Sequence, residues 1–234
     1  MALPIPQQTY LWPYKAEPRV KYRNAVLLVL LIIIIDQVLK IYVKTNMYYG
    51  VEGEIKIIGN WFRFHFLENE GMAFGMRLSE AATGKIILTL FRLVAVVFGF
   101  FLLKRLVDKQ YTKGAIICGA LILAGALGNL IDSMFYGMIF SHSSYHVRGL
   151  AHFTPFGEGY GQFLQGKVVD MFYFPLFSGT LPKWMPVVGG EHFEFFEPVF
   201  NFADASISVG VLTLVFFQKR LIHKKAAQPV GQGA

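Results

Sequence analysis

Two carboxylates in this sequence lie among apolar residues, where an ionised side chain is costly. Asp204 follows Asn201 in the stretch VFNFADASISVGV, and Asp170 lies in GKVVDMF. Two acids that share a partly desolvated site cannot easily both ionise, so one keeps its proton while the other acts as a base. Such a pair can activate water against an amide carbonyl and then protonate the leaving nitrogen. The same acids can also carry protons or cations across a membrane, so their chemistry leaves hydrolysis and transport both open.

Other polar residues accompany this pair in apolar segments. Asp36 and Lys40 have the i,i+4 spacing of an ion pair on one helix face, with Lys40 expected to extend outward to water. Asn129 and Asp132 end an apolar run. Asp132 is interpreted as readily as a solvated helix end as it is as a functional residue. Arg92 lies within another apolar run, and we expect it to be the ion-pair partner of a carboxylate.

The elements that position these residues are expected to cross a membrane. Of the 234 residues, 54% are hydrophobic and 16% are charged, which is too apolar for an ordinary soluble domain. A span requires roughly 20 mostly apolar residues. Four segments meet this requirement, at about 25–43, 83–103, 114–132 and 199–217. The expected fold is an all-α bundle of four transmembrane helices.

The flanking charges predict how the bundle is oriented. Clusters of Lys and Arg precede the first span, separate the second from the third and follow the fourth, which places both termini in the cytoplasm. Residues 44–82 and 133–198 then face the outside. Asp36 is 13 positions after Arg23, or about 20 Å along a helix, and therefore lies in the outer half of the first span. The other three carboxylates also fall at outer ends, so all four converge on one layer near the outer boundary. The sequence has no internal repeat of the kind that many transporters show.

The outer segments and the remaining motifs narrow the possible sites. Residues 51–78 contain the β-favouring runs IKII and WFRFHF, separated by Gly and Asn, which predicts a small sheet outside the membrane. Residues 133–198 predict an enlarged outer loop.

Other kinds of site are not indicated by the sequence. His142 and His146 have i,i+4 spacing but no HExxH motif, so we expect no metal site. No phosphate loop, GxGxxG or GxSxG motif is present. Cys118 is the single cysteine and is expected to be a buried packing residue. The Lys and Arg residues that give the net charge of +7 lie beside the spans, which argues against a nucleic-acid partner.

Five short motifs occur in a fixed order along the chain. They are DQVLK (36–40), NEGMAFG (69–75), GALGNLID (125–132), GKVVDMF (166–172) and FNFAD (200–204). Together they resemble the signature blocks of signal peptidase II, the bacterial lipoprotein signal peptidase, over roughly residues 24–218.

The resemblance implies an intramembrane aspartic protease that acts without metal or cofactor. Such an enzyme cleaves prolipoproteins just before the cysteine that carries a diacylglyceryl group. It implies a peptidase domain over 24–218, a cytoplasmic segment over 1–23 and a basic tail over 219–234. The implied partners are lipidated prolipoproteins and membrane lipid, with the cyclic peptide globomycin as inhibitor. The implied location is the bacterial inner membrane, with the active site near its outer face.

On these motifs, the resemblance implies that Asp170 and Asp204 form the catalytic pair. Substrate-binding or site-supporting roles fall on the other matching residues: Asp36, Lys40, Asn69, Gly71, Asn129, Asp132 and Asn201. The alternative is a small proton- or cation-coupled transporter that uses the same clustered acids.

The sequence departs from the family pattern in two places. The family usually has an arginine directly after the aspartate of the third motif, where this chain has Ser133. Lys167 and Arg148 are candidates to replace that arginine, and a Ser133→Arg substitution is expected to be tolerated. The last three motifs are also widely spaced, so 138–166 and 176–197 are interpreted as insertions. They form either a lid or partner surface, or a passive elaboration.

Overall fold

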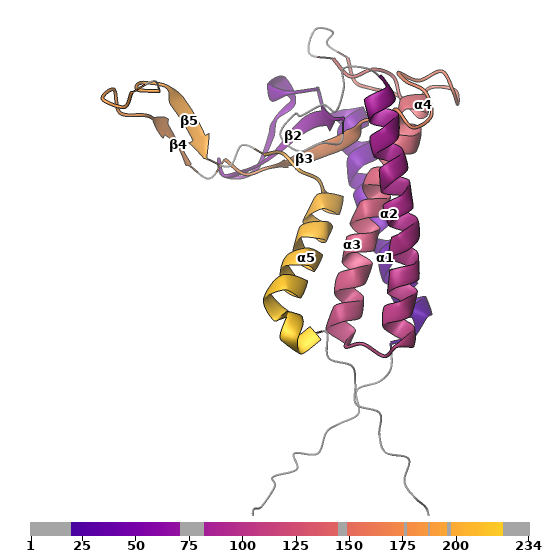
Figure 1. Ribbon diagram of the computed structural model, residues 1–234. Helices are drawn as coiled ribbons and strands as arrows, with labels where there is room; N and C mark the ends of the chain where they lie inside the picture. Colours follow the sequence, from indigo (N-terminus) through magenta and orange to yellow (C-terminus); the bar gives the residue numbers. More distant parts are fainter. Residues whose placement is uncertain are drawn as a thin grey trace, which may run out of the picture.

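The computed structural model describes residues 20–70, 82–144, 149–175, 177–186, 188–195 and 198–221. In this part of the chain four long helices run side by side, with two small sheets at one end (Figure 1). The helices are α1 (Tyr22–Asn46), α2 (Ala82–Asp108), α3 (Lys113–Ile131) and α5 (Phe202–Leu221). All four are long and apolar enough to cross a membrane, which confirms the predicted spans. The fourth begins at Phe202 rather than at 199, because the chain before it pairs with a strand.

The helix α3 lies at the centre of the bundle and packs closely against α5. A Cβ atom added to Gly125 would lie 2.2 Å from the main-chain oxygen of Ala203, and one on Gly210 would lie 2.8 Å from Ile122 Cγ1. Small residues allow two helix backbones to approach this closely in a membrane, where packing replaces the hydrophobic effect as the main source of association. Cys118 is buried in this interface region, as expected.

A three-stranded antiparallel sheet lies at one end of the bundle, in the order β1-β2-β3 (Figure 1). Its strands are β1 (Ile55–Ile58), β2 (Phe62–Asn69) and β3 (Val168–Tyr173), and β1 follows a short 3-10 turn, η1 (Val51–Gly53). This confirms the small sheet. The third strand was not predicted: Asp170 lies in β3 and pairs with Leu67 of β2, rather than in a loop.

A second antiparallel pair, β4 (Phe177–Thr180) and β5 (His192–Phe195), falls within the interpreted insertion 176–197. It projects sideways from the bundle as a hairpin (Figure 1). The chain returns from the hairpin to β3 before α5 begins. Phe200 exchanges main-chain hydrogen bonds with Phe172, at 2.7 Å and 3.1 Å, so the start of α5 is fastened to the end of β3.

The helix α3 continues into a π-helical turn, η3 (Asp132–Tyr136), and a last short turn, α4 (Gly137–Ile139). The following segment folds back over this end of the bundle. Gly166 N donates to Ser133 O across 2.9 Å, and Thr89 Oγ1 of α2 donates to Leu164 O across 3.0 Å. The described part of 138–166 is therefore a packed layer on the same end of the helices as the three-stranded sheet.

A buried lysine fastens this layer to the rest of the protein. The Lys44 ammonium pairs with Glu68 of β2 and donates to Ser143 Oγ across 3.1 Å. It also lies 5.3 Å from the ring centroid of Phe140 and 5.0 Å from that of Tyr160. One cation thus joins the end of α1, the sheet and the segment after α4, and aromatic faces stabilise it where water is excluded.

Candidate active site

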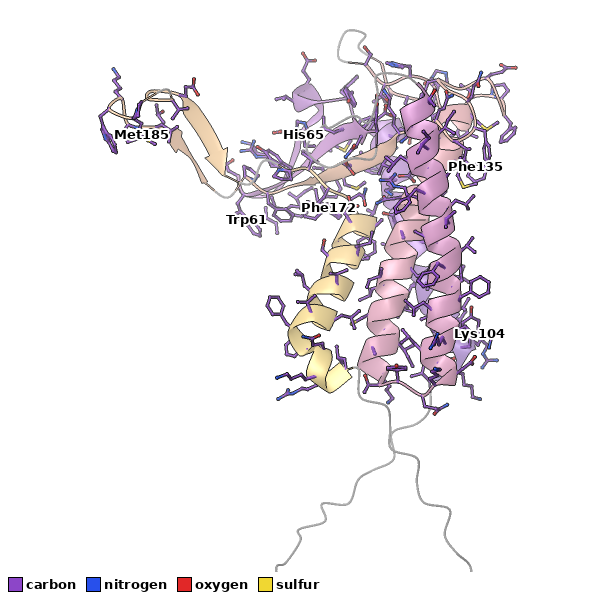
Figure 2. The ribbon with its side chains drawn as sticks, viewed as in Figure 1. Trp61, His65, Lys104, Phe135, Phe172 and Met185 are labelled. Carbon is purple, nitrogen blue, oxygen red and sulfur yellow. The ribbon has the colours of Figure 1, made fainter. Side chains whose placement is uncertain are left out.

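The polar residues singled out from the sequence meet where α1, α3, β3 and α5 come together, at the end of the bundle that carries the three-stranded sheet. Figure 2 shows Phe172, which is two positions after Asp170, beside the upper end of α5, whereas Lys104 of α2 lies at the opposite end. The layer is buried: Asp170 is 3% exposed, and Lys40, Asp132 and Asn201 are fully enclosed.

The first turn of α5 is capped by side chains on both sides of the helix start. Asn201 Oδ1 accepts a hydrogen bond from Asp204 N across 2.9 Å, and Asp204 Oδ2 accepts one from Asn201 N across 3.3 Å. This reciprocal arrangement is a capping box, which satisfies two main-chain donors that have no partner within the helix. Asp36 of α1 satisfies a third, because its Oδ1 accepts from Ala203 N across 2.9 Å. The acid that interrupts the apolar sequence of the fourth span is therefore part of its N-terminal cap.

Two asparagines connect the two aspartates. Asn201 Nδ2 donates to Asp170 Oδ1 across 2.7 Å and to Asn129 Oδ1 across 3.1 Å. Asn129 Nδ2 in turn donates to Asp204 Oδ1 across 2.7 Å. Each carboxylate is thus oriented by an amide that also contacts the other amide. The sequence predicted that Asp170 and Asp204 lie together, and the structure brings them to opposite ends of this asparagine bridge.

Lys40 is the ion-pair partner of two acids next to the bridge, Asp36 and Asp132. Its ammonium lies 2.9 Å from Asp36 Oδ2 and 2.8 Å from Asp132 Oδ2, and it donates to Asn129 Oδ1 across 2.9 Å. The expected i,i+4 pair with Asp36 is present. The expectation that Lys40 extends outward to water is wrong, because the side chain is fully buried and satisfied by three oxygen atoms. Asp132 is likewise an enclosed ion-pair partner and not a solvated helix end; its Oδ1 also accepts from Gln37 Nε2 across 2.8 Å.

Among the described carboxyl groups outside the spans, Asp170 has a pKa that is clearly shifted from its ordinary value. The pKa of its carboxyl is raised from 3.8 to about 7, chiefly by burial and next by the negative charge of the neighbouring Asp204. Hydrogen bonds from Asn201 and Asn69 and the charge of Lys40 act in the opposite direction, but they are smaller. A carboxyl with a pKa near neutrality can hold a proton and release it under the conditions in which an enzyme works.

The remaining predicted residues divide between the site and its surroundings. Asn69, at the end of β2, reaches Asp170 with its side chain. Lys167 lies near Tyr160, with its Nζ 6.0 Å from that ring centroid. Gly71, Arg148 and His146 fall outside the described residues. Among the residues that are described, no group of three or more His, Cys, Asp or Glu side chains has a geometry that could hold a metal ion.

Three further polar residues of this layer were not predicted from the sequence. Gln37 donates to Asp132 and accepts from Tyr136. On α2, Lys85 donates to the main-chain oxygen of Glu70 across 2.7 Å, and Thr89 is fully buried. The i,i+4 spacing of Lys85 and Thr89, which continues to Arg92 at i+7, is a polar stripe along an apolar helix and is visible in the sequence.

The fold and the site define a multi-pass membrane protein with two aspartates joined through two asparagines at one end of a four-helix bundle. The family described as signal peptidase (SPase) II matches residues 28–219. The chain therefore belongs to the signal peptidase II family, which confirms the resemblance.

Individual relatives agree with this membership. The chain is 47% identical over 196 residues to a lipoprotein signal peptidase of Porphyromonas gingivalis, over 83% of this chain and 82% of the relative. It is 38% identical to one of Amoebophilus asiaticus, over 83% of this chain and 77% of the relative. Two solved structures of bacterial membrane enzymes share the fold, with TM-scores of 0.52 and 0.51 at 24% and 26% identity. They cover 91% and 85% of this chain, and the matches span 99% and 94% of theirs.

Proposed function

We propose that this chain removes the signal peptide from diacylglyceryl-modified prolipoproteins, with Asp170 and Asp204 as its catalytic pair. The observation that carries the proposal is the asparagine bridge, which holds two carboxylates from distant parts of the chain in one hydrogen-bonded network. Membership of the signal peptidase II family supports the substrate class, and the relatives named above are lipoprotein signal peptidases. The relatives named above do not support the alternative of a proton- or cation-coupled transporter.

The geometry supports a division of labour between the two acids. Asp170, with its pKa near 7, carries the proton, and Asp204 takes a proton from a water molecule. The water oxygen attacks the scissile carbonyl carbon while Asp170 protonates the carbonyl oxygen. Asp204 then gives its proton to the amide nitrogen, the carbon–nitrogen bond breaks, and Asp170 recovers its proton from the hydroxyl group. The two acids titrate as a pair, so their roles belong to the pair as a unit.

The site lies at one end of the bundle, and the basic ends lie at the other. Lys104 and Arg105 end α2, and Lys219 and Arg220 end α5. Under the positive-inside rule these ends are cytoplasmic, so we place the acids near the outer face of a bacterial inner membrane, with both termini inside. Membrane lipid is then the surrounding solvent, and globomycin is the expected inhibitor.

The decisive experiment is cleavage of a purified diacylglyceryl-modified prolipoprotein by the full chain in detergent or proteoliposomes. Asp170→Asn and Asp204→Asn are each expected to abolish cleavage while the protein remains folded and inserted. Asp108→Asn is the matched control, because Asp108 is an exposed acid that pairs with Lys104 across 2.5 Å on α2. Normal cleavage by either site variant would disprove the pair, and ion flux without cleavage would favour transport.

A further inference from the structure

The helix α2 contributes a cation to the layer that holds the aspartates. Arg92 is ten positions after Ala82, the first residue of α2, and so lies about 15 Å along the helix. Its guanidinium Nη1 donates to Ser133 Oγ across 3.0 Å. Ser133 is fully buried, and its hydroxyl donates to the main-chain oxygen of Asn129 across 2.9 Å. Arg92 is therefore connected through one hydroxyl to the residue whose amide holds Asp204.

The charged groups that face Arg92 come from three other elements. They are Asp204 in α5, Asp132 at the end of α3 and Asp170 in β3, and Asp204 interacts with the guanidinium most strongly. Lys85 lies on the same face of α2 and repels it. The guanidinium is thus attracted by three carboxylates in a layer where a charge is poorly screened.

A second cation of the layer, Lys40, is already occupied, and a third, Lys85, is attracted by Glu70. Lys40 contacts both Asp36 and Asp132 at hydrogen-bond distance, so two acids share its one positive charge. With one proton held between Asp170 and Asp204, the four acids carry three negative charges against the single charge of Lys40. Arg92 reduces the remaining imbalance from two negative charges to one. This balance favours the state in which the aspartate pair keeps a single proton.

We propose that Arg92 is a positioning residue for cleavage: it holds the Ser133–Asn129–Asp204 connection and supplies the positive charge that keeps the aspartate pair singly protonated. The proposal rests on the assignment of Asp170 and Asp204 as the catalytic pair. Lys167 and Arg148 were the sequence-based candidates for the missing family arginine. The proposal assigns that role to Arg92 of α2 instead. The expectation that Ser133→Arg is tolerated is revised accordingly, because a second guanidinium would enter an enclosed position beside the first.

The test is the pH dependence of prolipoprotein cleavage by the purified full chain. Removing the cation in Arg92→Gln makes both carboxyls harder to ionise, so the acid limb of the kcat/KM profile is expected to move to higher pH by about one unit. At a pH on that limb the rate then falls about tenfold. Arg92→Lys keeps the charge and loses the planar donor group, so its profile is expected to stay near that of the native chain while its maximum rate falls.

The control is Lys104→Gln, which removes an exposed cation from the other end of the same helix and is expected to leave the profile unchanged. A lower rate for Arg92→Gln with an unmoved profile would overturn the proposal, since it would indicate structural damage alone. Unchanged cleavage by both Arg92 variants would overturn it as well. Because Asp170→Asn and Asp204→Asn are assayed in parallel, a failure of the catalytic pair itself is distinguished from a failure of Arg92.

Discussion

The Asn201 side chain donates to Asp170 across 2.7 Å and, through its oxygen, accepts from the main-chain N–H of Asp204 across 2.9 Å. One residue thus caps a helix and orients both acids. The stability of the start of α5 and the geometry of the site consequently depend on the same side chain.

The first prediction concerns this shared role. Asn201→Ala is expected to cost about 1 kcal/mol of stability through the lost cap. It is expected to reduce cleavage much more than that loss explains, because Asp170 loses an orienting contact and Asn129, which holds Asp204, loses its donor. Thermal unfolding and prolipoprotein cleavage are measured on the same preparation. The matched control is Asn46→Ala, which removes an exposed asparagine that caps the carbonyl of Tyr42 at the end of α1. Cleavage by Asn201→Ala at the native rate would contradict the assigned bridge.

The second prediction concerns the dependence of stability on pH. The pKa of Asp170 is about 7 in the folded protein, above its ordinary value of 3.8, so folding favours the protonated acid. The stabilisation linked to this proton is complete below the unfolded pKa and is lost as the pH rises through the folded one. Asp170→Asn has no such proton to lose. Its melting temperature relative to the native chain is therefore expected to rise between about pH 5 and about pH 8. A constant difference over that range would contradict the raised pKa.

The third prediction concerns the buried cation behind the bridge. Lys40→Met leaves Asp36 and Asp132 enclosed without a counter-charge, which is expected to cost about 3–5 kcal/mol. Lys104→Met breaks an exposed pair and is expected to change stability little. Chemical denaturation in detergent compares the two variants. Equal effects would show that Lys40 is not the centre of the network.

The fourth prediction concerns the contact between α3 and α5. A methyl group at position 125 would lie 2.2 Å from Ala203 O and 2.7 Å from Ile207 Cγ1, so Gly125→Ala forces the helices apart. The expected cost is about 1–3 kcal/mol, together with reduced cleavage as Asp204 moves away from Asn129. Gly149→Ala is the control, because nothing lies within 4 Å of the added atom. Native activity in Gly125→Ala would contradict this close approach.

Much of this arrangement follows from the sequence because apolar runs and charges are local signals. The four spans, the Asp36–Lys40 pair and the gathering of carboxylates at one end were all predictable from run length, spacing and flanking charge. The sheet was predicted where β-favouring residues alternate. The strand around Asp170 was missed, because its pairing with β2 joins segments about a hundred positions apart.

The side-chain partners were predicted less well, since they depend on tertiary packing. Lys40 was expected to reach water, whereas Asp132 from α3 gives it a second carboxylate inside the bundle. Arg92 was expected to pair with a carboxylate; its guanidinium donates to the hydroxyl of Ser133, and the neighbouring carboxylates attract it. Nothing local connects Arg92 with Ser133, which lies 41 positions further along the chain.

The main-chain bonds between Phe172 and Phe200 have a consequence for the segment that they enclose. The chain leaves the site after Phe172 and returns to it at Phe200, and these two residues are hydrogen-bonded to each other. The hairpin between them therefore does not set the positions of Asp170 and Asp204. For the same reason the hairpin is a natural place to graft a tag or reporter peptide, or to replace the segment with a short turn.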